Sequence, residues 1–281
     1  MTRALSRREQ IPMQVLLFSH DPMYASAAVA AGVAGVVVDW EWRGKAERQA
    51  GWNTQINRAT VDDLRAIHAA AGDRVVCRIN NSADRVAECR LAIDNGAGEV
   101  WLPMVRSVDE VEACLAAIDG RAGLGVMVET REAMRLGRAL SQLPLAHAYI
   151  GLHDYYIDGG STGLFEPIVD GTLDRFREDY PGEIGFAGIT RPGGGNPIPQ
   201  RLLLAAMARL GCAFGVARRG FLADVPICAV DAAIDEIAAE MTRLRSRAAH
   251  AVDHDHALLA ALVQRRVESK PAPEGEIACA P

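Results

Sequence analysis

Short apolar segments alternate with longer amphipathic segments along most of the chain. Eight short segments rich in Val, Ile and Leu predict strands buried on both faces, and they span residues 14–18, 35–39, 74–79, 99–102, 123–128, 148–151, 184–189 and 213–216. Segments with the apolar spacing of helices lie between most of them, at 25–31, 61–71, 83–95, 108–117, 132–141, 173–180 and 199–210. This alternation indicates a parallel sheet whose neighbouring strands are joined by helices.

The number of strands and the length of 281 residues favour a (β/α)8 barrel, the TIM-barrel fold. The alternative is a doubly wound open sheet, but the Gly-x-Gly-x-x-Gly turn typical of that fold is absent after the first strand, where the sequence is Phe-Ser-His-Asp-Pro.

We expect the barrel to span residues 1–228, followed by a C-terminal helical extension at 229–269 that packs between subunits. The extension is predicted to contain two helices, 230–249 and 257–267, separated by a polar break at 253–256. Residues 270–281 are expected to be a disordered tail because they are rich in Pro, Gly and Glu.

Composition excludes several classes of protein. The chain carries 30 Lys and Arg against 36 Asp and Glu, and this net charge of −6 argues against a nucleic-acid-binding surface. The longest apolar stretch, 25–38, is too short to cross a membrane, and the charged N-terminus lacks the apolar core of a signal peptide. The six cysteines form no Cys-x-x-Cys pair, which favours free thiols. These features together predict a soluble cytoplasmic protein.

Only two of the basic residues are lysines, Lys45 and Lys270. Lys270 falls in the predicted tail, and Lys45 falls in the loop after the second strand, where we expect it to contact a phosphate, coenzyme A or solvent. None of the predicted strands contains a lysine. A Schiff-base aldolase needs a lysine amine in its active site, so the sequence disfavours that chemistry.

The active site of a (β/α)8 barrel forms at the carboxyl ends of its strands. This rule brings together side chains that follow five predicted strands: His20, Asp39 with Glu41, Arg78, Glu129, and His153 with Asp154. The arginines after the last two strands, Arg191, Arg218 and Arg219, are expected to be solvated, with a phosphate or coenzyme A contact as the alternative.

Three segments at these strand ends carry a resemblance to a known family. They are Val-Glu-Thr-Arg-Glu-Ala at 128–133, Ile-Gly-Leu-His-Asp at 150–154, and the Leu-Pro-Met-Val run that ends the segment 97–105. With Asp39-x-Glu41 and Arg78-Ile-Asn, the chain resembles the HpcH/HpaI aldolase and citrate lyase β-subunit family, in order from the first strand to the last.

The resemblance implies a metal-dependent carbon–carbon lyase that acts through the enolate of a pyruvate- or oxaloacetate-type keto acid. It implies that Glu129 and Asp154 bind Mg²⁺ or Mn²⁺ and that Arg78 stabilises the enolate and binds the substrate carboxylate bidentately. It also implies that Asp39 and Glu41 orient metal-bound water. The family's substrate-binding positions correspond to Gly151, Leu152 and Pro103, and its members are commonly homo-oligomers, often hexamers or trimers of dimers.

Elementary chemistry is consistent with this interpretation. An α-keto acid chelates a hard cation through a carboxylate oxygen and its keto oxygen, and two protein carboxylates with water complete an octahedron. The cation and a nearby guanidinium both stabilise the negative charge of an enolate. The absence of a strand lysine favours the same metal-dependent route.

The chain departs from the family in one position. Hydroxy-keto-acid aldolases of the family have a histidine general base directly after the strand-two acidic pair, and here that position is Trp42. His20, His153 or a metal-bound hydroxide are the alternative bases. Three other functions stay open: a condensing enzyme, an acyl-CoA lyase of the citryl or malyl type, and a non-catalytic barrel that binds a keto acid. The partners expected are therefore a keto acid and an aldehyde or acyl-CoA.

Overall fold

The structure, a computed structural model, describes residues 12–48, 58–191, 193–218 and 220–268. Arg219, Lys270 and the tail expected at 270–281 lie outside these residues.

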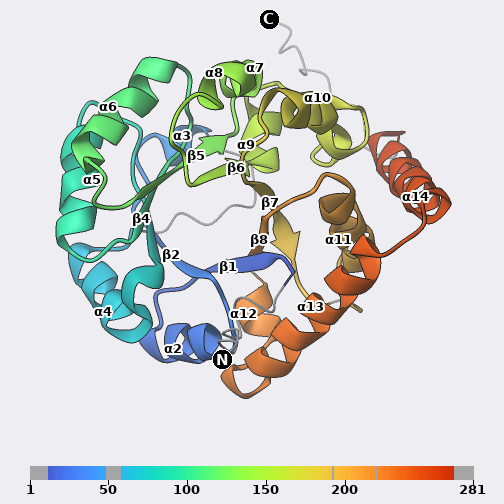
Figure 1. Cartoon of the computed structure of the whole chain (residues 1–281), viewed down its shortest axis with the longest axis horizontal. Coiled ribbons are helices and arrows are strands. Elements are labelled where there is room, and N and C mark those ends of the chain that lie inside the picture. Colours follow the sequence, from blue (N-terminus) through green and yellow to red (C-terminus); the bar gives the residue numbers. More distant parts are fainter. Residues whose placement is uncertain (1–11, 49–57, 192, 219, 269–281) are drawn as a thin grey trace, which may run out of the picture.

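Eight parallel strands close into a barrel in chain order (Figure 1). They are β1 (Gln14–Phe18), β2 (Gly35–Asp39), β3 (Val75–Arg78), β4 (Glu99–Leu102), β5 (Gly123–Val128), β6 (His147–Ile150), β7 (Ile184–Ile189) and β8 (Phe214–Ala217). Leu16 of β1 pairs with Gly35 of β2, and Gln14 pairs with Phe214 of β8, so β1 closes the barrel. The predicted fold is confirmed, and no predicted strand end is displaced by more than one residue.

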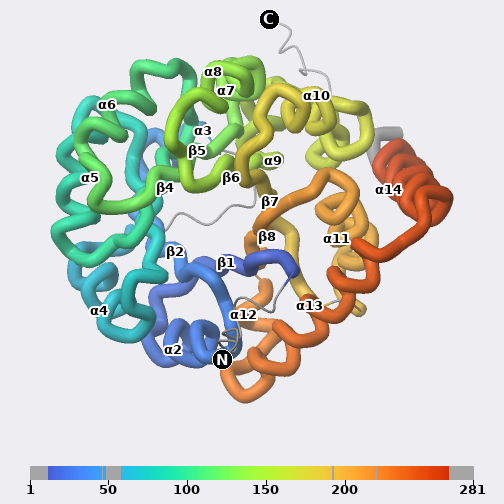
Figure 2. The backbone as a smooth tube through the Cα atoms, in the orientation of Figure 1, coloured from blue at the N-terminus to red at the C-terminus, as the bar shows by residue number. Residues whose placement is uncertain are grey.

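The helices follow the chain around the barrel, and the longer ones form its outer ring (Figure 2). They are α2 (Pro22–Ala30), α3 (Lys45–Arg48), α4 (Val61–Ala71), α5 (Arg85–Asp94), α6 (Val108–Ile118), α7 (Arg131–Arg135), α8 (Gly137–Leu140), α9 (Leu152–Ile157), α10 (Thr172–Asp179), α11 (Gln200–Arg209), α12 (Phe221–Asp224), α13 (Val230–Arg245) and α14 (Ala249–Glu268). The helix predicted at 132–141 is divided into α7 and α8. The short helices α3, α9 and α12 were not predicted, because helices this short do not repeat the 3.6-residue period.

Large side chains fill the barrel interior. Trp101 of β4 stacks on Tyr149 of β6 with ring centroids 5.2 Å apart, and its indole Nε1 donates a hydrogen bond to Glu99 at 2.7 Å. The neighbouring strand accommodates the indole with a glycine, since a Cβ on Gly125 would lie 2.4 Å from Cδ1 of Trp101. The barrel is therefore packed below its carboxyl-end mouth, as is usual for this fold.

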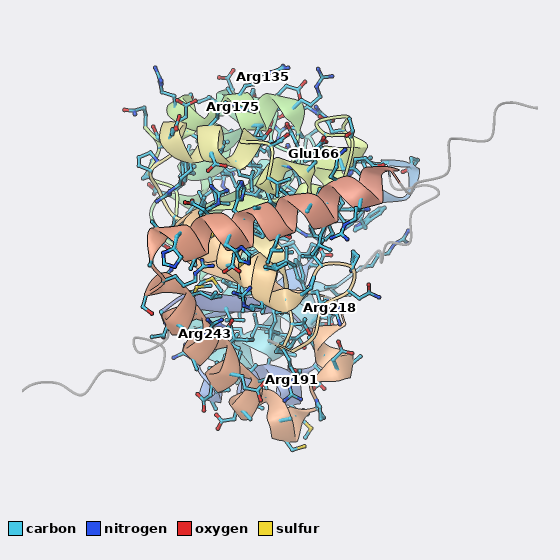
Figure 3. All side chains as sticks on the ribbon, turned by 90° about the vertical axis from the view of Figure 1, so that its right-hand side faces the viewer. Arg135, Glu166, Arg175, Arg191, Arg218 and Arg243 are labelled. Atoms are coloured by element: carbon cyan, nitrogen blue, oxygen red, sulfur yellow. The ribbon has the colours of Figure 1, made fainter. Side chains whose placement is uncertain are left out.

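The C-terminal extension packs on the barrel's own helices. α13 lies against α11 and α2, and α14 lies across the outside of α11 (Figures 1 and 3). The polar break predicted at 253–256 is wrong, because α14 continues through it. Asp255 is buried there and accepts hydrogen bonds from Arg201 (2.7 Å) and Arg247. These two guanidinium groups neutralise the carboxylate, so a polar residue is compatible with the packed face of the helix.

Within the described ranges, no helix is both long and apolar enough to cross a membrane. Cys77, Cys89, Cys114 and Cys212 are buried free thiols, and Cys228 is an exposed one, as the sequence predicts.

Candidate active site

A cavity of about 600 Å³ lies at the carboxyl ends of the strands. Its charged part is lined by Asp39, Lys45, Arg78, Glu129 and Asp154, which come from the ends of β2, β3, β5 and β6 and the segments after them. Apolar residues line much of the remainder: Phe18, Met127, Leu152, Leu164, Phe165 and Leu222. A mostly apolar cavity of this size with a few convergent polar groups is typical of a small-molecule site.

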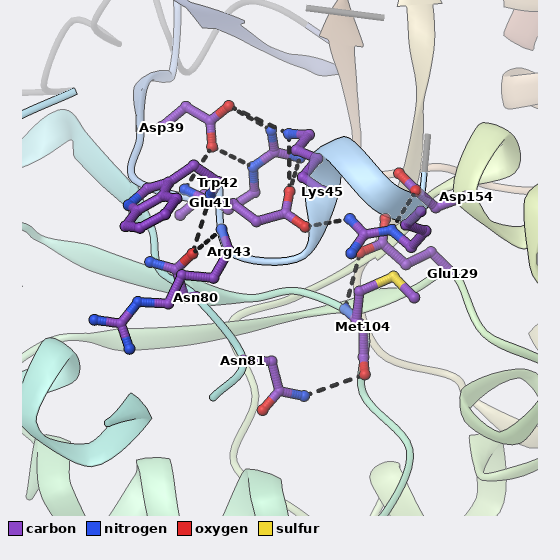
Figure 4. Close-up of polar contacts among 12 residues, drawn as sticks. Asp39, Glu41, Trp42, Arg43, Lys45, Asn80, Asn81, Met104, Glu129 and Asp154 are labelled. Atoms are coloured by element: carbon purple, nitrogen blue, oxygen red, sulfur yellow. Dashed lines mark hydrogen bonds and ion pairs between the residues drawn. The ribbon is translucent and has the colours of Figure 1, made fainter. Parts of the chain in front are cut away.

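Glu129 follows β5 and is almost completely buried, with 1% of its surface exposed. Its Oε1 accepts a hydrogen bond of 2.9 Å from the backbone N–H of Met104 (Figure 4), a residue with φ of +50°. No ion pair joins Glu129 to a basic side chain among the described residues. Burial raises the pKa of Glu129 to about 8, and the negative charges of Asp154 and Glu41 add to this effect.

Asp154 lies in the first turn of α9, directly after β6. It is buried, and its Oδ1 accepts a hydrogen bond of 3.0 Å from Nε of Arg48. Because β5 and β6 are adjacent in the barrel, Asp154 lies close enough to Glu129 to influence its ionisation. The two predicted metal ligands are thus brought together.

Arg78 and Asp39 form a two-pronged ion pair at the ends of β3 and β2. Nε and Nη2 of Arg78 donate to the two carboxylate oxygens of Asp39, at 2.7 and 2.6 Å, while Nη1 lies 3.3 Å from Glu41. Burial alone would raise the pKa of Asp39, but the guanidinium of Arg78 and the ammonium of Lys45 hold it below its ordinary value. Asp39 therefore holds the guanidinium of Arg78 in place, and its implied role in orienting metal-bound water stays a prediction. Because Asp39 already accepts hydrogen bonds from Nε and Nη2 of Arg78, this edge of the guanidinium is not open for the predicted bidentate contact with a substrate carboxylate.

Lys45 and Arg48 lie on the single turn of α3 and both pair with Glu41. Nζ of Lys45 is 2.9 Å from Oε2 of Glu41 and 3.6 Å from Asp39, and Nη2 of Arg48 is 2.6 Å from Oε1 of Glu41. Only 2% of Lys45 is exposed. The alternative in which Lys45 faces solvent is therefore wrong, because the ammonium is buried against two carboxylates. Contact of Lys45 with a phosphate or coenzyme A stays a prediction.

The two histidines predicted as bases both line the cavity. His20 is exposed in the loop after β1, and His153 is half-buried in the first turn of α9. Trp42, at the position where the motif resemblance would place a histidine, is 41% exposed and packs against the guanidinium of Arg58, 4.8 Å from its ring centroid. Trp42 does not line the cavity, so His20 and His153 are the histidines that do so within the described chain.

Of the predicted substrate-binding residues, Gly151 and Leu152 line the cavity, whereas Pro103 is buried and is not among the described lining residues. Arg218, expected to be solvated, lines the cavity after β8 and pairs with Asp224 at 2.6 Å. Its position directly after a strand was the feature of the sequence that could have predicted a place in the cavity. Asn80, the last residue of the Arg78-Ile-Asn motif, has no role predicted from the sequence, yet its Oδ1 accepts hydrogen bonds from the backbone N–H groups of Trp42 and Arg43 and so holds the loop after β2.

The residues present fit a divalent cation. Two buried carboxylates follow adjacent strands, and one of them, Glu129, has no cationic partner among the described residues. Such a charge is costly in the interior unless a cation or a proton neutralises it. Within the described ranges, no group of three or more His, Cys, Asp or Glu side chains is arranged to hold a metal, so a cation here would have two protein carboxylates and would need water or substrate for its other ligands. Oxygen donors of this kind suit Mg²⁺ or Mn²⁺, which retain water and substrate ligands.

The protein is a (β/α)8 barrel with a cluster of acidic and basic side chains in the cavity at the carboxyl ends of its strands. Comparison with known proteins supports the fold. No family model and no curated protein sequence matches the chain. Among solved structures, it is similar to an HpcH/HpaI aldolase from Desulfitobacterium hafniense DCB-2 (TM-score 0.56, 14% identity, 75% of this chain and 89% of that one). It is also similar to a citrate lyase from Burkholderia xenovorans LB400 (0.55, 16%, 97% and 98%).

A 3-hexulose-6-phosphate synthase from Salmonella typhimurium is similar to the same degree (TM-score 0.57, 14% identity, 83% of this chain and 100% of that one). The three likenesses establish the barrel fold. Because one fold supports many activities, the activity must be argued from the site.

Proposed function

We propose that the protein is a metal-dependent carbon–carbon lyase of the aldolase type, which cleaves or forms a bond to the enolate of a pyruvate- or oxaloacetate-type keto acid. The observation that carries this proposal is that two buried carboxylates, Glu129 and Asp154, lie near each other and near Arg78 at the barrel mouth. The motif resemblance to HpcH/HpaI aldolases, together with the fold likeness to structures bearing that name, supports it.

Charge balance in the cluster supports both the cation and the substrate. Fully ionised, the cluster holds four carboxylates (Asp39, Glu41, Glu129 and Asp154) against three cations (Lys45, Arg48 and Arg78), a net charge of −1. A divalent cation would change this charge to +1, and a keto acid with one carboxylate would return it to zero. Buried clusters are most stable near neutrality, so a cation and a keto-acid monoanion complement this one.

Glu129 and Asp154 would hold the Mg²⁺ or Mn²⁺. When bound, the ion would polarise the keto oxygen and stabilise negative charge on the enolate.

Arg78 and Lys45 supply positive charge at the substrate carboxylate. Both line the cavity, and both are fixed by carboxylates, Arg78 by Asp39 and Lys45 by Glu41. Cations that are already oriented stabilise a developing charge without reorganising during the reaction. Asp39 and Glu41 are positioning residues in this arrangement.

The proton required at the enolate carbon is assigned to one of the two cavity histidines, His20 or His153. Cleavage removes a proton from the substrate hydroxyl, and a second proton later adds to the enolate carbon to form the methyl group. An imidazole can accept and donate protons near neutral pH. Leu164 and Phe165 line the same cavity and make part of its wall apolar.

Proton exchange of pyruvate in D₂O tests the proposal without knowledge of the second reactant, an aldehyde or an acyl-CoA. With Mg²⁺ or Mn²⁺ we expect loss of the methyl proton signal in NMR, abolished by EDTA and by Glu129→Gln. His20→Gln and His153→Gln identify the base as the variant that slows exchange. Pyruvate binding without exchange would contradict the lyase and indicate a keto-acid-binding barrel.

We also propose a homo-oligomer, a hexamer or trimer of dimers, in which the extension 229–269 contacts a neighbouring subunit. The support is the family resemblance and the length of chain beyond the barrel. Light scattering of the eluted protein measures the mass, and a monomer would contradict this proposal.

A further inference from the structure

Arg48 links two carboxylates that follow different strands. Its Nη2 lies 2.6 Å from Oε1 of Glu41, in the segment after β2, and its Nε lies 3.0 Å from Oδ1 of Asp154, after β6. The side chain is 19% exposed, so the contacts are made largely out of water. Hydrogen bonds between ionised groups in such surroundings are strong.

The two carboxylates of the proposed cation site therefore differ in their ion pairing. Asp154 is paired with a guanidinium, whereas Glu129 has no basic partner among the described residues. Glu41, the third carboxylate near them, is held by both Lys45 and Arg48. With Nη1 of Arg78 also 3.3 Å away, three cations surround Glu41 and leave it less available to a metal ion than Glu129 is.

We infer that Arg48 competes with the divalent cation for Asp154, so that the cation binds at the expense of the Arg48–Asp154 ion pair. This inference rests on the proposed function in one respect, namely that a cation binds at Glu129 and Asp154. A guanidinium and a divalent ion on the same carboxylate repel each other strongly in a partly buried site. Arg48 therefore lowers the affinity of the site for the divalent cation. While no cation is bound, Arg48 stabilises the adjacent buried carboxylates.

Titration with Mn²⁺, followed by the electron paramagnetic resonance of free Mn²⁺ and without substrate, measures this competition on the full-length protein. Arg48→Gln removes the competing charge and is expected to lower the Kd for Mn²⁺ by about tenfold. Arg48→Lys keeps the positive charge but cannot contact both carboxylates in the same way. Its Kd for Mn²⁺ should lie between those of the wild type and Arg48→Gln.

Arg43→Gln is the matched control. Arg43 belongs to the same segment but pairs with Asp84 (2.5 Å) and Glu88 (3.8 Å), away from Asp154. Its removal should leave the Kd for Mn²⁺ within about twofold of the wild type, because exposed charges are screened by solvent.

Thermal unfolding provides a second readout. Without metal, Arg48→Gln should melt at a lower temperature than the wild type, because the ion pair between Arg48 and Asp154 is lost. Saturating Mn²⁺ should raise the melting temperature more in Arg48→Gln than in the wild type, since tighter binding to the folded state stabilises it more.

The inference is overturned if Arg48→Gln and Arg48→Lys bind Mn²⁺ no more tightly than the wild type, or if Arg43→Gln gains as much. Its failure is separable from that of the proposed function. Tighter Mn²⁺ binding in Arg48→Gln, with no pyruvate exchange in the wild type, would contradict the lyase alone. Exchange in the wild type, with no gain in Arg48→Gln, would contradict only the role of Arg48. Absence of Mn²⁺ binding in every protein would overturn both.

Discussion

A Cβ atom on Gly151 would lie 2.3 Å from Oε2 of Glu129 and 2.5 Å from its Cβ. Gly151 has φ of −88°, a value open to any residue, so a side chain is excluded by the position of Glu129. The residue that the motif resemblance assigns to substrate binding thus also sets where the proposed metal ligand lies.

Gly151→Ala is expected to displace the carboxylate of Glu129. Affinity for Mn²⁺, measured by calorimetry, should fall by about tenfold or more, since support of a ligand is worth that much. Stability in denaturant should fall by about 1–3 kcal/mol from overpacking. The control is Gly193→Ala, where an added Cβ meets nothing within 4 Å and neither quantity should change. Unchanged affinity in Gly151→Ala would show that Glu129 does not bind the cation.

Glu129 should make the stability of the metal-free protein depend on pH. Burial raises its pKa from 4.5 to about 8, so between these values the folded protein retains a proton that the unfolded chain releases. Stability must then fall as pH rises through this window, by up to about 1.4 kcal/mol per pH unit from this group. Above about pH 8, ionisation of the buried carboxyl group of Glu129 reduces the stability by its full amount. Below pH 4.5 the group is protonated in both states and has no such effect.

Chemical denaturation in EDTA at pH 5, 6.5 and 8 measures this dependence. Glu129→Gln cannot ionise, so its stability relative to the wild type should improve steadily from pH 5 to pH 8. Parallel behaviour of the two proteins over this range would show that the carboxyl group titrates normally.

Lys45 is the lysine that lines the cavity, and imine chemistry there is directly testable. Its ammonium pairs with Glu41 and Asp39, whereas imine formation needs the neutral amine. Treatment with pyruvate and borohydride should therefore leave the intact mass unchanged, with a known Schiff-base aldolase as the positive control. A stable adduct on Lys45 would contradict the metal-dependent route.

Asp255 should anchor α14 to the barrel. Asp255→Ala leaves the guanidinium of Arg247, 7% exposed, without its carboxylate and should destabilise the protein by about 3 kcal/mol. Asp253→Ala removes an exposed carboxylate two residues earlier in the same helix and should change stability by less than about 0.5 kcal/mol. Equal stability of the two variants in urea would show that the buried ion pair contributes nothing to packing of the helix.

The sequence predicted the strands well because their apolar runs are local and continuous. Each strand is buried on both faces, so most of them end at a polar residue, as β2 does at Asp39, or directly before one, as β5 does before Glu129. The helices were less predictable. Asp255 was interpreted as part of a break because its two arginine partners are distant in the sequence or lie in the preceding loop.

By itself, the sequence determined the barrel and the set of side chains at its mouth, because strand order and the carboxyl-end rule fix which residues converge. Only the tertiary structure decided how those side chains pair. It buried Lys45 against Glu41 and Asp39, gave both oxygens of Asp39 to Arg78, and left Glu129 beside Asp154 without a basic partner in the described chain. The physical reason is that ion pairs depend on distances of a few ångströms between residues from different strands, and the spacing of residues along the chain does not encode those distances.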